Sequence, residues 1–115
     1  MLVNSHSQFA MNCDPKQGNL PDMLRNNILS SQYFKDLFSL KTLQDCISEI
    51  ERNVQSAEPW VLGANGVPSS LFCILYKMML MHLTERQVQQ LLKYRKNPFV
   101  RICGALFVRF LSPHD

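Results

Sequence analysis

The chain has few side chains of the kinds that catalyse reactions, and their spacing assembles no catalytic group. Its three histidines are His6, His82 and His114, and neither a Ser/His/Asp nor a Cys/His neighbourhood follows from their positions. Glu49 and Glu51 lie two residues apart, so they cannot face each other on a helix. His82 ends an apolar helical pattern, where a helix cap or a partly buried polar residue is a simpler interpretation than a base. We therefore expect no catalytic residues and no enzyme.

The cysteines and glycines do not form a metal or phosphate site. The cysteines are Cys13, Cys46, Cys73 and Cys103, and no pair has the roughly two- to four-residue spacing of a zinc knuckle. Residues 63–66 (GANG) lack the Lys-Ser/Thr of a phosphate-binding loop. We expect no metal, no cofactor and no small-molecule substrate, and we expect the last three cysteines to be small buried apolar side chains. Because no signal peptide is evident, we expect a reducing, intracellular compartment.

Charge is distributed unevenly along the chain. Residues 59–115 hold seven Lys/Arg against two acidic residues, whereas residues 1–58 hold five against seven. The basic half includes the run Lys93, Tyr94, Arg95 and Lys96. Cations beside an aromatic ring suit RNA, because they bind phosphates while the ring stacks on a base, although no known RNA-binding signature accompanies the run. Two interpretations stay open beside it: a solvated basic face, and a stripe through Arg101 and Arg109 that faces an acidic protein segment.

The elements that must position these side chains are predicted to be helices throughout. The composition, 46% hydrophobic and 18% charged, is typical of a globular chain, and four glycines are too few for the turns of a many-stranded sandwich. Periodicity predicts a loose arm over residues 1–19 and one all-α domain of five or six helices over residues 20–115. The expected helices cover about residues 21–28, 33–38, 43–57, 71–79, 85–92 and 98–111.

Two of these helices have the clearest patterns. In the 43–57 helix, Thr42 and Asp45 suggest a capping box. The expected inward stripe is Leu43, Cys46, Ile47, Ile50, Val54 and Ala57, and the expected solvated side is Gln44, Ser48, Glu49, Glu51, Arg52 and Gln55. The 71–79 helix is apolar around most of its circumference and is therefore expected to be central. Lys77 and His82 interrupt the apolar run of this segment, so the helix is predicted to lie in the core and not to span a membrane. Its methionines, Met78, Met79 and Met81, are predicted to be core, although they would also suit an adaptable binding groove.

A loop separates these two helices and contains the only tryptophan, Trp60. Pro59 and Pro68 frame it, and Gly63 and Gly66 allow a positive φ. We expect Glu58, Pro59, Gly63 and Gly66 to form a rigid structural loop that presents Trp60 beside the central helix.

Several segments, taken in order, resemble the amino-terminal domain of the pre-mRNA-splicing factor 38 family. They are "NILSSQYFKDLFSLKTLQDCISEI", "EPW", "PSSLFCILYKMMLMHLTERQVQQLL" and "NPFVRICGALFVRF", which span about residues 19–113. The Glu-Pro-Trp in the loop resembles the B-type paralogues more than the founding member. Relatives usually continue beyond the position of Pro113, so the domain is expected to be truncated, and the loop over residues 61–67 is shorter than in some relatives.

The resemblance implies a non-catalytic, nuclear scaffold domain that acts in spliceosome maturation, around the tri-snRNP and the precatalytic complex. Its partners would be other spliceosomal proteins, bound as helical or extended segments, with Trp60, Arg101 and Arg109 on or near the partner face. The alternative for both arginines is structural, capping carbonyl groups or pairing with Glu58. The alternative function is weak RNA binding through Lys93, Tyr94, Arg95 and Lys96.

Overall fold

A computed structural model describes residues 20–111 and confirms the all-α class. The helices are α1 (Asp22–Ser30), α2 (Gln32–Asp36), the 3-10 helix η1 (Leu37–Ser39), α3 (Leu43–Asn53), α4 (Ser70–Met81), α5 (Glu85–Leu92) and α6 (Pro98–Leu111). Within the described range, β pairing is limited to one isolated bridge, between Trp60 and Pro68. The predicted arm over residues 1–19 lies outside the described residues.

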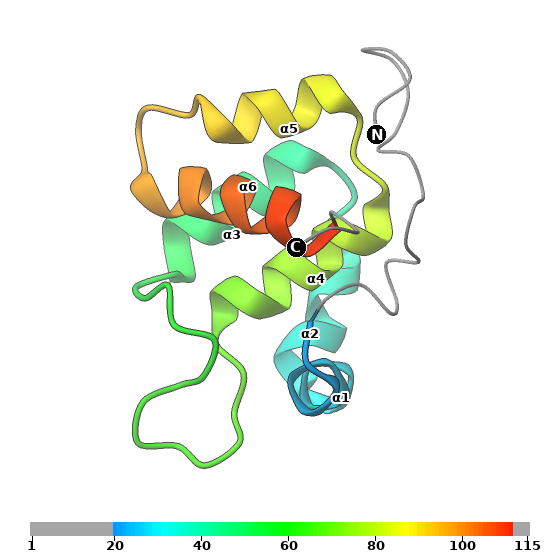
Figure 1. Ribbon diagram of the computed structural model, residues 1–115, viewed down its shortest axis with the longest axis vertical. Helices are drawn as coiled ribbons and strands as arrows, with labels where there is room; N and C mark the ends of the chain where they lie inside the picture. The colour runs from blue at the N-terminus through cyan, green and yellow to red at the C-terminus, as the bar shows by residue number, and fades with distance from the viewer. Residues whose placement is uncertain (1–19, 112–115) are drawn as a thin grey trace.

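Helix α4 is the centre of the domain, as its all-round apolar sequence predicts. It contacts α1, α2, α3 and α6, and in Figure 1 it runs obliquely between α6 and the α1–α2 pair. Ile74, Leu75 and Met78 are fully buried, and Met79 is nearly so, so these methionines belong to the core. Ser69 caps the helix at its start, and His82 ends it in a left-handed conformation with a φ of 58°. The central helix therefore fixes where the other elements can lie.

Local capping signals define the helix starts as the sequence predicts. Thr42 and Asp45 form a complete capping box on α3, and Thr84 and Gln87 form another on α5. The carbonyl oxygen of the Asn97 side chain accepts a hydrogen bond from the Phe99 amide at 2.8 Å, at the first turn of α6. These caps satisfy amides that the helices leave unpaired.

Helix α3 is shorter than predicted. It ends at Asn53 because Val54 takes an extended conformation and places its side chain in the core. The chain then leaves the helix axis, so Ala57 is exposed and does not continue the buried stripe. The spacing of apolar residues in the first two helices predicts that Met23 and Phe38 lie on their apolar faces, but these side chains are exposed, by 68% and 55%.

Glu49 is buried, and the prediction that it lies on the solvated side of α3 is wrong. It is 8% exposed and accepts hydrogen bonds from the Tyr33 hydroxyl at 2.6 Å and from Arg52 at 2.8 Å. The Asn53 side-chain amide also donates to it. Burial raises the pKa of Glu49, but the hydrogen bonds from Tyr33, Asn53 and Arg52 outweigh it and hold the pKa below its ordinary value. The carboxylate thus joins α2 to α3.

The Glu49 network predicts a pH-dependent stability. Because the folded pKa of Glu49 is lowered, its contribution is complete above about pH 4.5, the ordinary value, and is lost as the pH falls through the folded pKa. We expect Glu49→Gln to lower the free energy of unfolding by about 1–2 kcal/mol at pH 7, with a smaller difference near pH 3. Urea unfolding at pH 7, 5, 4 and 3 measures it. Glu58→Gln, an exposed control, should match wild type, and a pH-independent Glu49→Gln difference would contradict the assignment.

Candidate docking groove

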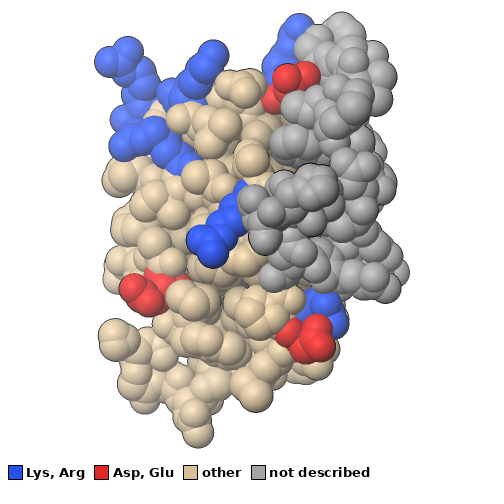
Figure 2. Space-filling view, viewed as in Figure 1, with Lys and Arg blue, Asp and Glu red and all other residues tan. Residues whose placement is uncertain are grey.

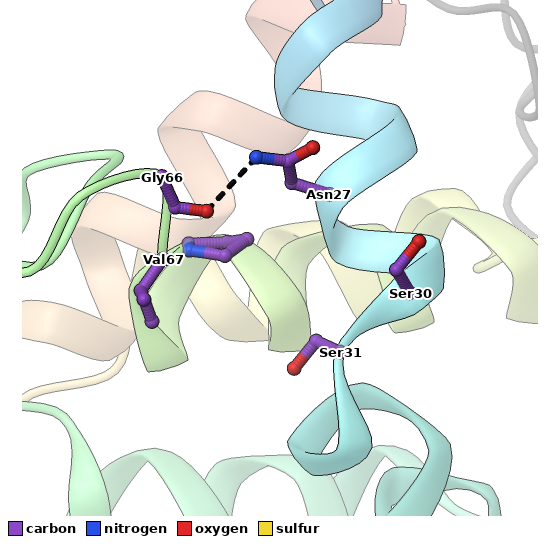
Figure 3. Close-up of a pocket in the computed structure, with 6 residues that line it drawn as sticks. Asn27, Ser30, Ser31, Gly66 and Val67 are labelled. Carbon is purple, nitrogen blue, oxygen red and sulfur yellow. Dashed lines mark hydrogen bonds between the residues drawn. The ribbon is translucent and has the colours of Figure 1, made fainter.

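The loop between α3 and α4 is held in place at both ends and at its tip. The Val61 amide donates to the Val67 carbonyl at 2.8 Å, and the Ser69 amide donates to the Pro59 carbonyl at 2.9 Å. Gly63 and Gly66 have φ values of 80° and 74°, as expected from their positions. At the tip, the Asn27 side-chain amide donates to the Gly66 carbonyl at 2.9 Å, which ties the loop to α1 (Figure 3). These hydrogen bonds therefore hold the backbone that carries Trp60 in one conformation.

Trp60 lines a groove of about 580 Å³ where the loop meets three helices. The other lining residues are Pro21, Met23 and Leu24 at the start of α1, Pro59 in the loop, Phe72 on α4, and Arg109 and Phe110 on α6. The rings of Phe72 and Phe110 meet edge to face, with centroids 6.2 Å apart. Apart from the Arg109 guanidinium, the groove is lined by apolar side chains, and Met23 is mostly exposed within it.

Arg109 is the charged member of this groove. Its guanidinium lies 5.6 Å from the centre of the Phe110 ring, and it forms no ion pair with any residue in the range 20–111. A cation at the rim of an apolar groove favours an apolar segment that also carries a carboxylate. Trp60 also borders a second hollow of about 330 Å³, which it shares with Asn53 and Leu62.

Arg101 occupies a different part of the molecule from Arg109. Its guanidinium donates to the carbonyl oxygens of Tyr94 at 2.8 Å and Arg95 at 3.4 Å. These contacts are of the structural kind, because they satisfy backbone acceptors in the connection between α5 and α6. Glu58 forms no ion pair with either arginine among the described residues.

The predicted RNA-binding run lies around a third hollow, of about 510 Å³, at the α5–α6 connection. Lys93, Tyr94, Arg95 and Lys96 all line it, together with Arg86, Gln89 and Gln90 of α5. The Tyr94 hydroxyl donates to the Glu51 carboxylate at 2.7 Å. The hydrogen bond to Glu51, together with desolvation, raises the pKa of Tyr94.

The described part of the chain brings together no three side chains of the metal-binding types. Cys46, Cys73 and Cys103 are buried free thiols, as predicted. Burial raises the pKa of Cys46 and of Cys73 to about 11, and it also raises the pKa of Cys103, so all three stay protonated at neutral pH. None of the helices in residues 20–111 is long and apolar enough to cross a membrane.

Comparison with known sequences places the chain in a family. The profile of the PRP38 family matches residues 10–115, which is most of the chain. The chain belongs to the PRP38 family. This confirms the resemblance seen in the segments from the first helix to the last.

Curated relatives of this PRP38-family chain are named as splicing factors. It is 43% identical to "Pre-mRNA splicing factor SR-like 1" of Arabidopsis thaliana over 93 residues, and this match covers 81% of the chain and 24% of that protein. It is 34% identical to "Pre-mRNA-splicing factor 38B" of Homo sapiens over 117 residues, and this match covers 85% of the chain and 21% of that protein. The chain thus spans about a quarter or less of the length of these relatives.

Sequence reasoning found two members of the groove, Trp60 and Arg109, and missed most of the others. The spacing of the last helix predicts an inward Phe110, and the spacing of the first helix predicts that Met23 lies on its apolar face. The sequence signal that could have indicated the groove is the pair of apolar residues Pro21 and Met23 at a helix start, because exposed side chains there can contact a neighbouring loop. That signal does not identify the neighbour, because the loop is far away in sequence.

Proposed function

We propose that this PRP38-family chain is a non-catalytic protein-interaction domain of a nuclear pre-mRNA splicing factor. Its family and the names of its relatives support a role in splicing. We propose further that it acts as a scaffold during spliceosome maturation, around the tri-snRNP and the precatalytic complex, by docking other spliceosomal proteins. The scaffold role does not require a catalytic or metal-binding group.

The observation that carries the proposal is the groove of Trp60 and Arg109. The groove is apolar, and its one cation, Arg109, forms no ion pair within the described residues. The loop that carries Trp60 is held by two backbone hydrogen bonds and by the side chain of Asn27. Exposed apolar surface of this kind, bordered by a charge, is typical of protein interaction sites. The ligand we propose is a helical or extended segment of a spliceosomal protein, with apolar side chains for the groove and an Asp or Glu for Arg109.

A pair of matched variants tests this proposal by capture from nuclear extract treated with nuclease. The double variant Met23→Ser/Arg109→Glu changes the groove, whereas Leu29→Ser/Lys35→Glu makes the same chemical changes at exposed positions outside it. We expect the groove variant to retain at least about tenfold less splicing protein, because it removes an apolar contact and reverses the charge. The control should retain wild-type amounts. Equal recovery by both variants, at unchanged melting temperature, would refute the groove as the docking site.

A further inference from the structure

The hollow at the α5–α6 connection carries a concentration of positive charge that the docking groove does not use. Arg86, Lys93, Arg95 and Lys96 all line it, and all four are exposed. None of them forms an ion pair within residues 20–111, and no carboxylate from that range lines the hollow. Figure 2 shows basic side chains gathered at the upper left of the molecule, where the α5–α6 connection lies in Figure 1. Such a set of uncompensated cations favours an anionic ligand.

The backbone that carries these cations is fixed by the protein itself. Arg101 holds the carbonyl oxygens of Tyr94 and Arg95, and the Tyr94 hydroxyl is held by Glu51. The connection is thus anchored to α6 and to α3. Because a ligand would not have to order this backbone, less conformational entropy is lost on binding. The hydrogen bonds of Arg101 and Glu51 leave the four cationic side chains of the hollow unengaged.

The side chains of this hollow fit a phosphate backbone better than an acidic protein segment. None of the large exposed apolar side chains of the described residues lines it, and Tyr94 is the aromatic side chain in its lining. Two of the four cations are lysines, which are depleted from protein interfaces, and the other two are arginines, which occur at protein and nucleic-acid interfaces alike. Arg, Lys, Gln and Tyr are, in contrast, the side chains that commonly contact phosphate and sugar, and Gln89 and Gln90 lie among the cations.

We propose that this hollow binds the sugar-phosphate backbone of single-stranded RNA. The four cations contact successive phosphates, and the half-buried ring of Tyr94 borders the path as a surface on which a base can stack. The proposal adds an activity at a site separate from the groove of Trp60 and Arg109. It does not depend on whether that groove docks a protein.

A salt titration with two matched double variants tests the proposal. The probe is a fluorescein-labelled 15-nucleotide oligouridylate, and its anisotropy is measured with the 115-residue chain at 50, 100 and 200 mM salt. Four phosphate contacts on a single strand give a slope of log K against log salt of about −2.8, which is about a fiftyfold loss from 50 to 200 mM. Lys93→Gln/Lys96→Gln should reduce the slope to about −1.4 and weaken binding at 50 mM by about tenfold or more.

The control is Lys35→Gln/Lys41→Gln, which removes the same charge from exposed lysines outside the hollow and should bind like wild type. Thermal melting of each variant shows that it is folded. Equal binding by the two double variants, or no binding of wild type at 50 mM, would overturn the proposal. A fluorescein-labelled 15-residue polyglutamate that binds more tightly than the oligouridylate would also overturn it, in favour of an acidic protein segment.

Discussion

Replacing Phe107 with alanine should lower the free energy of unfolding by about 3–5 kcal/mol, the largest effect expected of a single substitution in this chain. Phe107 is fully buried on α6, which packs against α3, α4 and α5. The substitution removes apolar surface and leaves a cavity among helices that cannot all move to fill it. Urea unfolding followed by circular dichroism measures the change.

The matched control is Phe38→Ala. Phe38 is 55% exposed, contacts the edge of the Phe34 ring and lies under the Lys77 ammonium at 4.8 Å. Its loss should cost only about 1 kcal/mol, since most of the ring is already in water. If Phe107→Ala cost no more than Phe38→Ala, the position of α6 in the core would be wrong.

The second large effect is expected at Gly104, where α6 packs closely against α5. A Cβ atom at this position would lie 2.9 Å from the Cβ of Leu91 and 3.2 Å from the backbone nitrogen of Leu92. Valine adds two methyl groups to that collision, so Gly104→Val should force the helices apart and destabilise the fold by about 3 kcal/mol. Thermal and urea unfolding both measure this.

The neighbouring position supplies the control for Gly104. Ala105 is exposed on the same helix, so Ala105→Val changes helix propensity without crowding and should cost less than about 0.7 kcal/mol. Gly104→Ala should fall between the two valine variants, because its crowding is offset in part by the better helix propensity of alanine. If Gly104→Val were as stable as Ala105→Val, the close packing of α5 on α6 would be contradicted.

The features that were predictable from sequence are those set by neighbouring residues. Thr42 and Thr84 cap helices through side chains three residues away, and Gly63 and Gly66 permit loop conformations that other residues disfavour. Periodicity also identified the central helix, because an all-round apolar helix must be enclosed. For this reason the fold class and most helix starts followed from the sequence.

The features that were missed depend on residues distant in sequence. Glu49 looks solvated on its own helix, but its burial is made favourable by hydrogen bonds from Arg52 and Asn53 and from the Tyr33 hydroxyl, which is sixteen residues earlier. The groove likewise joins the start of α1 to the end of α6, with Trp60 between them. No periodic pattern contains that juxtaposition, since it exists only once the helices have packed.

The central claim is that the groove of Trp60 and Arg109 docks a splicing protein, and site-specific photo-crosslinking tests it most directly. A photoreactive benzoylphenylalanine replaces Met23 inside the groove or Leu29, on the same helix, outside it. In nuclease-treated nuclear extract, we predict that the Met23 probe crosslinks to an apolar segment of a splicing protein that contains Asp or Glu, and that Arg109→Glu abolishes the crosslink. Equal crosslinking from Leu29, or none from Met23 while the bait retains splicing proteins, would contradict the claim.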